Sequence, residues 1–356
     1  MTDKESREGA RTLKERAVSL KQPFSSGGMS LRSRILELLR RAGEEYLSGE
    51  EIAKRLGVSR TAVWKHIKEL REAGYAIKSQ SRSGYSLEDA PDRLLAEEIK
   101  NGLQTHFVGR NIVFFDAIDS TNQVAKQLAA QGAASGTVVV AEAQGKGRGR
   151  LNRSYFSPKG KGIWFSVILR PHILPQEAPK CTLLAAVAVA MAMKRFGLQA
   201  AIKWPNDILH EGKKLTGILT EMSAEIDRIN YIVIGTGINV NIKEEEFPEE
   251  LRDKATSLAV MKGENLPRVA FFQAVLESLD ALCIQLDEEG FSPIIARWRA
   301  CAVTLGQEVR VISATGKESF DGRAVDIDEE GALLVETEDG MRRVLAGDVS
   351  IRPKNA

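Results

Sequence analysis

Residues 143–170 read AQGKGRGRLNRSYFSPKGKGIWFSVILR, a glycine-rich basic segment followed by a run of apolar residues. The stretch has no acidic residue and seven cationic ones: Lys146, Arg148, Arg150, Arg153, Lys159, Lys161 and Arg170. Its glycines let the backbone approach a ligand closely and present N–H groups, so the segment is suited to wrapping phosphates or a carboxylate. A solvated basic loop is the alternative interpretation. The spacing matches neither the GxxxxGK[ST] nor the GxGxxG motif of nucleotide-binding loops.

The apolar run 163–169 predicts a buried strand, and comparable segments surround it. Further strands are expected at 111–116, 137–143, 200–204, 215–221 and 231–240. Helical patterns occupy 121–131, 179–196, 267–287 and 292–300. Because the strands outnumber the helices between them, a regular βαβ alternation is disfavoured, and we expect a mixed or antiparallel sheet with helices, the α+β class. The boundary motif Pro91-Asp92 places this domain at 91–302.

Residues 29–90 have the pattern of a helix-turn-helix followed by a wing. Three short amphipathic segments are separated by glycines, and Ser48 and Ser59 stand where the second and third helices need a capping oxygen. After Gly74, two short extended segments flank a turn, which predicts a hairpin that carries Arg82.

The third expected helix has two different faces. Val63, Ile67 and Leu70 share one side. The opposite side carries the residues Arg60, Thr61, Trp64, Lys65 and Lys68. Residues 59–85 contain six cations against two carboxylates, a local net charge of +4. We therefore expect the basic face to enter a DNA major groove, with Arg82 reaching phosphate or the adjacent groove. A winged helix used for protein contacts is the alternative.

The two ends of the chain differ from its middle. Residues 303–356 contain short β-prone runs with turn signals at Thr315-Gly316, Glu330-Gly331 and Asp339-Gly340, which predicts a small β-barrel. Residues 1–28 mix both charge signs and end in serines and glycines, so we expect a flexible leader there.

The composition bounds the class of protein. Of 356 residues, 43% are hydrophobic and 28% are charged, and the net charge is only +2, so affinity for polyanions must come from local clusters. The three cysteines form no CxxC pair, which favours a reducing cytoplasm over a disulfide framework or a zinc knuckle. The longest nearly apolar run, 181–193, is shorter than the ~20 residues that cross a bilayer, so we expect a buried helix and no membrane partner. Neither a catalytic triad nor a cysteine nucleophile is evident, and metal ligands stay unassigned.

Three shorter motifs carry polar side chains that suit either a ligand or the fold. KWPND at 203–207 ends an expected strand with a cation, a rigid turn and two polar residues, and a surface turn with an ion pair is the alternative. DSTN at 119–122 can bind a small polar ligand or cap the following helix. GTGINVN at 235–241 can likewise serve the fold alone, as a tight strand edge.

The order of these motifs resembles the biotin–protein ligase family. The similarity rests on GRGR (147–150), SP (157–158), KWPND (203–207), GIL (217–219) and GIN (237–239). With the winged helix in front and the barrel behind, the chain after about residue 29 is similar to the bifunctional biotin operon repressors and biotin–acetyl-CoA-carboxylase ligases. The resemblance implies a class II synthetase-like sheet in the central domain.

The resemblance also implies a two-step reaction. Biotin and MgATP give biotinyl-5′-AMP and pyrophosphate, and a lysine of the biotin carboxyl carrier protein then attacks the acyl adenylate. Arg150 and Lys203 are expected to contribute most to transition-state stabilisation, because the attack of one anion on another needs cations and N–H dipoles rather than a nucleophilic side chain. A repressor implies operator DNA as a second partner and a homodimer that biotinyl-5′-AMP favours.

A set of binding residues is carried over by position. Biotin is expected to contact Ser120, Thr121, Asn122, Gln144, Arg148, Gly149, Arg150, Lys203, Gly217 and Leu219. The nucleotide is expected to contact Gly147, Arg153, Tyr155, Asn206 and Asn239. A core strand explains Gly217 and Leu219 nearly as well. Two residues depart from the family pattern, since Asn152 stands where Gly is frequent and Tyr155 where Trp is frequent. Asn tolerates left-handed backbone angles and Tyr can still stack on adenine.

Two other functions remain open. One is a transcription factor whose ligase-like domain only senses a ligand, which the intact Arg150 and Lys203 disfavour. The other is a lipoate or related acyl–protein ligase, which the winged helix and the KWPND motif disfavour. A carrier-protein biotinylation assay separates the first from a ligase, and competition between biotin and lipoate separates the second.

Overall fold

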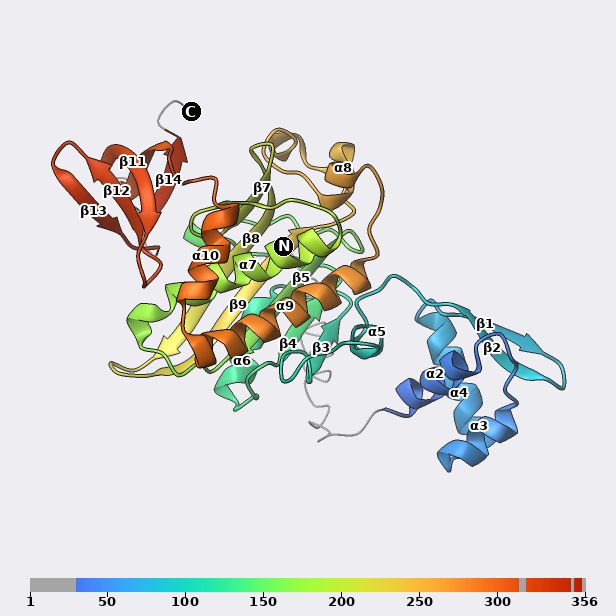
Figure 1. Cartoon of the computed structure of the whole chain (residues 1–356). Coiled ribbons are helices and arrows are strands. Elements are labelled where there is room, and N and C mark those ends of the chain that lie inside the picture. The colour runs from blue at the N-terminus through green and yellow to red at the C-terminus, as the bar shows by residue number, and fades with distance from the viewer. Residues whose placement is uncertain (1–29, 314–317, 347–348, 354–356) are drawn as a thin grey trace, which may run out of the picture. The chain divides into compact units, whose positions relative to one another are not determined.

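The computed structural model describes residues 30–313, 318–346 and 349–353. The chain divides between Pro91 and Asp92 into two compact units (Figure 1). The leader expected at 1–28 and the turn expected at Thr315-Gly316 lie outside the described residues.

The first unit is a helix-turn-helix with a wing, as the sequence predicts. Its elements are α2 (Leu31–Ala42), α3 (Gly49–Leu56), α4 (Arg60–Glu72), β1 (Ala76–Gln80) and β2 (Gly84–Asp89). The hydroxyl oxygens of Ser30, Ser48 and Ser59 each accept a backbone N–H at 3.1 Å, which satisfies a donor that the first turn of a helix leaves open. β1 and β2 form an antiparallel hairpin, and Arg82 lies in the turn between them with φ of 67°.

The second unit is built on a seven-stranded mixed sheet in the order β3-β4-β5-β9-β8-β7-β6. Its strands are β3 (Ile112–Phe115), β4 (Val138–Ala141), β5 (Gly162–Leu169), β6 (Ala201–Lys203), β7 (Asp207–His210), β8 (Lys213–Ala224) and β9 (Ile229–Asn239). β3 and β4 run parallel and the other neighbouring strands run antiparallel, which confirms the predicted α+β class. β7 has no counterpart among the predicted strands, because four residues between two turns are too few to show a period.

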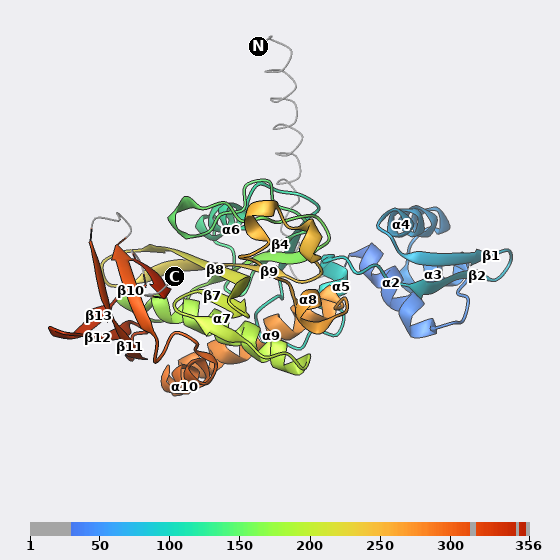
Figure 2. The same ribbon diagram turned by 90° about the horizontal axis from the view of Figure 1, so that it is seen from above.

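Helices cover both faces of this sheet. They are α5 (Ala96–Lys100), α6 (Thr121–Ala130), α7 (Pro179–Arg195), α8 (Leu258–Lys262), α9 (Arg268–Glu289) and α10 (Ser292–Cys301), with short 3₁₀ turns at η1 (Arg150–Asn152), η2 (Pro175–Glu177), η3 (Glu244–Glu246) and η4 (Glu249–Leu251). Figure 2 shows α6 on one side of the sheet and α7 and α9 on the other. In β4, Val139 packs against α6, whereas Val138 and Val140 join the cluster that contains α7 and α9. Because successive strand residues point to opposite faces, a strand covered on both sides must be apolar throughout.

Two apolar helices form much of this core. In α7 the predicted buried helix is confirmed, with residues such as Cys181, Leu184 and Ala188 at most 1% exposed. Among the described residues, α9 is long and apolar enough to cross a membrane by length and composition. Its Phe271 and Phe272 are fully buried inside the protein, which is typical of a core helix.

The last part of the second unit is a five-stranded antiparallel sheet in the order β13-β12-β11-β10-β14. Its strands are β10 (Glu308–Ser313), β11 (Ser319–Ile327), β12 (Leu333–Thr337), β13 (Gly340–Val344) and β14 (Val349–Pro353). Gly331 and Gly340 each directly follow a turn, with φ of 83° and 112°, a region that favours glycine. The small β-barrel domain expected at this end of the chain is present as an antiparallel β domain, whose five described strands form a sheet with β13 and β14 at its edges.

Candidate functional site

The glycine-rich loop, residues 142–161, connects β4 to β5 and is held across its width by backbone hydrogen bonds. From base to tip, the N–H groups and their acceptor carbonyls are Gly160 with Glu142 (3.3 Å), Gln144 with Ser157 (3.3 Å), Tyr155 with Gly147 (2.8 Å) and Gly149 with Arg153 (2.8 Å). A Cβ atom at Gly147 would lie 2.7 Å from the carbonyl oxygen of Tyr155, so glycine is required for this close approach. The loop is an irregular hairpin with a defined course.

A cavity of about 430 Å³ lies beside this loop and collects residues that are far apart in the sequence. The sequence-predicted ligand residues that line it are Ser120, Thr121, Asn122, Gln144, Arg148, Gly149, Arg150, Arg153, Tyr155, Lys203, Asn206, Gly217, Leu219 and Asn239. Gly147 is absent from the described lining and serves the loop packing instead. The volume suits a small molecule, since such sites typically measure about 300–1,000 Å³.

One part of the cavity lining is a network of neutral polar groups around Gln144. The backbone N–H and the hydroxyl of Thr121 donate to Gln144 Oε1 at 2.9 and 3.1 Å, and Gln144 Nε2 donates to Ser157 Oγ at 3.2 Å. Ser120 precedes α6 but its side chain makes no capping hydrogen bond. The 119–122 segment therefore directs polar atoms to the cavity as well as starting the helix.

Two residues behind this network were not singled out by the sequence. Ser166 Oγ lies 2.8 Å from Thr121 Oγ1 and 2.5 Å from Asn122 Oδ1, and Asn122 Nδ2 donates to Glu221 at 2.9 Å. Ser166 sits inside the apolar run of β5, and Glu221 lies within β8. A lone serine in a buried strand was the available signal, because it needs a polar partner.

The charged part of the cavity lining is mostly cationic. Its charged lining residues are Arg148, Arg150, Arg153, Lys203, Lys214, Lys254 and Asp207. Burial lowers the pKa of the Lys203 ammonium, while Asp207 opposes that shift and Lys214 adds to it. The carboxylate of Asp207 is itself paired with Lys214 Nζ at 2.6 Å. An anionic ligand in this cavity would therefore be attracted and would favour the charged form of Lys203.

Arg150 joins the glycine-rich loop to the C-terminal sheet. Its guanidinium donates to Asn206 Oδ1 at 3.2 Å and to the carbonyl oxygens of Ala346 and Val349, both at 2.7 Å. Because nothing local in the sequence relates the loop to β14, this contact is decided by the tertiary structure alone. Arg170, the last cation of the basic stretch, lies outside the lining residues and binds backbone carbonyls at the far end of β5.

Tyr155 forms a wall of the cavity. Its hydroxyl donates to the carbonyl oxygen of Gly237 at 2.8 Å, and burial raises the pKa of that hydroxyl. Cβ atoms at Gly217 and Gly237 would lie 2.9 and 2.5 Å from the ring. These glycines therefore make room for the tyrosine, and Gly217 is placed by packing as well as by any ligand.

Further lining residues were not predicted individually as ligand contacts. They are Gly235, Thr236, Phe247, Leu251, Ala255, Ser350 and Ile351, among others. At Gly235 a Cβ atom would lie 2.0 Å from Asn122 Oδ1, so glycine at this position allows the asparagine to reach the polar network. In the sequence, the only sign of this role is the alternation of glycines in GTG (235–237). The pairing of β9 with β5 and β8 places this segment in the sheet beside the cavity.

The first unit presents the basic face that the sequence predicts. In α4, Val63, Ile67 and Leu70 are at most 1% exposed, whereas Trp64 is 58% exposed. The other predicted DNA-contacting side chains are also exposed: Arg60, Thr61, Lys65, Lys68 and Arg82. Within the part of the chain that the structure describes, no group of three or more His, Cys, Asp or Glu side chains could hold a metal ion.

Comparisons with known proteins define the class first. Residues 114–239 match the biotin/lipoate A/B protein ligase family, residues 31–86 match a helix-turn-helix domain, and residues 304–352 match the biotin protein ligase C-terminal domain. A biotin protein ligase from Aquifex aeolicus, solved in complex with biotin and ATP, is similar in structure, with a TM-score of 0.60 and 31% identity. That likeness covers 69% of this chain and 100% of the other.

Two curated relatives extend the likeness across nearly the whole chain. The bifunctional ligase/repressor BirA of Bacillus subtilis (strain 168) is 44% identical over 323 residues, which cover 90% of this chain and 99% of the relative. The protein of that name from Escherichia coli (strain K12) is 31% identical over 312 residues, covering 87% and 94%. This chain therefore belongs to the family of bifunctional biotin–protein ligases and repressors, which confirms the resemblance found in its sequence.

Proposed function

We propose that this chain makes biotinyl-5′-AMP from biotin and ATP and transfers the biotinyl group to a lysine of the biotin carboxyl carrier protein of acetyl-CoA carboxylase. The observation that carries the proposal is the cavity itself, in which the polar network around Gln144 and the cationic cluster around Lys203 line one space. A neutral polar group and a pair of anions can occupy such a space together. Biotin and the phosphates of ATP have this combination of groups.

The first step forms one bond and breaks another. A carboxylate oxygen of biotin attacks the α-phosphorus of ATP, and the bond from that phosphorus to the bridging oxygen breaks to release pyrophosphate. Arg150 and Lys203 are assigned to cancel the charge that repels the two anions, since preorganised donors stabilise such a transition state. Arg150 can stabilise this charge while it keeps its hydrogen bonds to the carbonyl oxygens of Ala346 and Val349, or after a phosphate oxygen replaces one of them.

The second step needs no enzyme nucleophile. The neutral amine of the acceptor lysine attacks the carbonyl carbon of the acyl adenylate, AMP leaves with the electron pair of the broken bond, and the amine loses a proton to solvent. We assign the neutral network of Ser120, Thr121, Asn122 and Gln144 to biotin, with Gly217 and Leu219 beside it. Arg153, Tyr155, Asn206 and Asn239 are assigned to the nucleotide.

Mg²⁺ belongs to this proposal as part of the MgATP substrate. The cavity offers one carboxylate, Asp207, among its lining residues. That suits Mg²⁺, which is usually held by one or two carboxylates together with substrate phosphates and water. Asp207 is the residue that we expect nearest to the ion.

The winged unit supports a second role as a biotin-responsive repressor of biotin synthesis or transport genes. The exposed face of α4, with Arg82 on the wing, is assigned to operator DNA. One recognition helix provides limited affinity, so we propose a homodimer on paired half-sites that biotinyl-5′-AMP favours. Sedimentation with and without the adenylate measures that coupling. We further propose a cytoplasmic location and the domain boundaries 29–90, 91–302 and 303–356.

A carrier-protein assay tests the proposed function. With saturating biotin and MgATP, we expect one biotin to be added to the acceptor lysine and biotinyl-5′-AMP to be retained by the enzyme, both visible by mass spectrometry. Lipoate in excess should not compete. Adenylate formation without transfer would indicate a sensor, and transfer of lipoate in place of biotin would indicate the related ligase class.

A further inference from the structure

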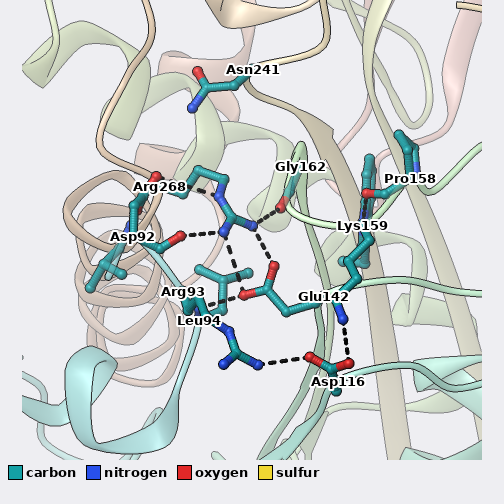
Figure 3. Close-up of polar contacts among 12 residues, drawn as sticks. Asp92, Arg93, Leu94, Asp116, Glu142, Pro158, Lys159, Gly162, Asn241 and Arg268 are labelled. Carbon is teal, nitrogen blue, oxygen red and sulfur yellow. Dashed lines mark hydrogen bonds and ion pairs between the residues drawn. The ribbon is translucent and has the colours of Figure 1, made fainter. Parts of the chain in front are cut away.

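A buried arginine lies at the base of the glycine-rich loop. Arg268 begins α9 and is 3% exposed, and Glu142, the first residue of the loop, is 1% exposed. Arg268 Nη1 donates to Glu142 Oε2 at 2.9 Å, and Nη2 lies 3.4 Å from Glu142 Oε1 (Figure 3). The other contacts of the same carboxylate include the backbone N–H of Leu94, which donates at 2.7 Å.

The same guanidinium reaches the other end of the loop. Arg268 Nη1 also donates to the carbonyl oxygen of Gly162 at 3.1 Å, and Gly162 is the first residue of β5. Nη2 donates to the carbonyl oxygen of Asp92, and Nε lies 3.5 Å from the carboxylate of Asp92. One planar group therefore joins the residue where the loop starts, the residue after the loop ends and the first residue of the second unit.

We infer that Arg268 is a positioning residue for adenylate formation, which acts by holding both ends of the glycine-rich loop. This inference rests on the proposed function. Gln144 lies two residues beyond Glu142 and belongs to the polar network of the cavity. A displacement at the loop base is therefore passed directly to a ligand residue, and a shift of about 1 Å can cost roughly 10²-fold in rate.

The choice of residue type supports a positioning role. A planar guanidinium presents five N–H donors in a fixed geometry, whereas an ammonium is a point charge. A lysine at 268 would keep the attraction to Glu142 but could not also bind Gly162 and Asp92 in the same way. A second pair, Lys159 with Asp116 at 2.5 Å, also holds the loop (Figure 3), but these side chains are 60% and 50% exposed, so the pair is worth little.

The test compares Arg268→Lys with Arg170→Lys in the full-length protein. Arg170 directly follows β5, donates to backbone carbonyls and lies outside the cavity lining, so Arg170→Lys is a matched loss of arginine hydrogen bonds at the other end of this strand. We expect Arg268→Lys to raise the KM for biotin in biotin-dependent ATP–pyrophosphate exchange and to speed adenylate release, each by about 10-fold to 100-fold. Arg170→Lys should leave both values within about twofold of the wild type while shifting the melting temperature comparably.

A second variant keeps the test decisive if Arg268→Lys does not fold. Glu142→Gln preserves the shape of the side chain and the acceptor for Leu94 but removes the charge that orients Arg268. The same rise in KM is expected. The inference is overturned if either folded variant matches Arg170→Lys in KM and adenylate release. A wild-type protein that makes no adenylate would instead overturn the proposed function, so the two failures are distinguishable.

Discussion

The recognition helix α4 and the glycine-rich loop both concentrate cations, but they place them differently. On α4, Lys65 and Lys68 project from a helix into solvent and are exposed. Beside the loop, Lys203 lies in a cavity where burial lowers its pKa. Exposed charges act through a screened field and tolerate small shifts, whereas donors in a cavity act through exact placement in a low-dielectric site. The same residue types therefore suit a polymer of phosphates in one region and a single reaction in the other.

The largest expected effect is at Lys203. We expect Lys203→Met to lower the rate of adenylate formation by about 10²–10³-fold, because it removes a preorganised cation from the site of charge development. Pre-steady-state formation of biotinyl-5′-AMP is the measurement. Operator binding by the winged unit should persist. Loss of DNA affinity equal to the loss of ligation would break the division between the two regions.

Gly235→Ala tests how strictly the cavity demands placement. The new Cβ atom would meet Asn122 Oδ1 at 2.0 Å, so the asparagine must move, and we expect the KM for biotin to rise by about 10-fold to 100-fold. Gly49→Ala in α3 is the matched control in the other unit, since its Cβ atom would lie 3.5 Å or more from its neighbours. Gly49→Ala should leave ligation unchanged, and an equal effect of the two substitutions would contradict this view of the cavity.

Arg60→Ala tests the role of the exposed cations on α4. We expect operator binding to weaken about 5-fold to 10-fold, with the dependence of log K on log salt reduced by about 0.9, because one phosphate contact is lost. Titrations at several salt concentrations measure both quantities. Ligation should keep its wild-type rate. A variant with weaker binding but an unchanged salt slope would place Arg60 on a base rather than on a phosphate.

The smallest expected effect is electrostatic and concerns stability. The hydrogen bond from Lys159 lowers the pKa of Asp116, with partial burial opposing the shift and Arg93 adding to it. A carboxyl group whose pKa is lowered on folding stabilises the protein above its unfolded pKa, near 3.9, and this stabilisation disappears as the pH falls through the folded pKa. Because the side chain is half exposed, Asp116→Asn should cost less than about 1 kcal/mol at pH 7. Urea unfolding at pH 7 and at a series of lower pH values measures the difference, which should shrink once the pH falls below about 3.9.

Local patterns account for much of what the sequence analysis predicts correctly. The two faces of α4 follow from helical periodicity, and the serines that start α3 and α4 follow from capping chemistry. The buried strand β5 follows from an apolar run that Ser166 alone interrupts. The features that the sequence does not predict leave no recognisable local pattern. β7 is too short to show a period, and Ser166 and Glu221 acquire a role only through side chains from another segment.

The sequence by itself therefore predicts the chemistry of this protein. It does so through an acid-free glycine-rich segment, a basic amphipathic helix and a set of motifs in the order found in the biotin–protein ligase family. Periodicity, caps and turns act over a few residues, so they can be recognised one segment at a time. Folding alone settled that Arg150 binds the carbonyls of Ala346 and Val349 and that Arg268 bridges both ends of the glycine-rich loop. Those contacts join segments that are distant in the chain, and the burial of a charge specifies that it needs partners without specifying which ones.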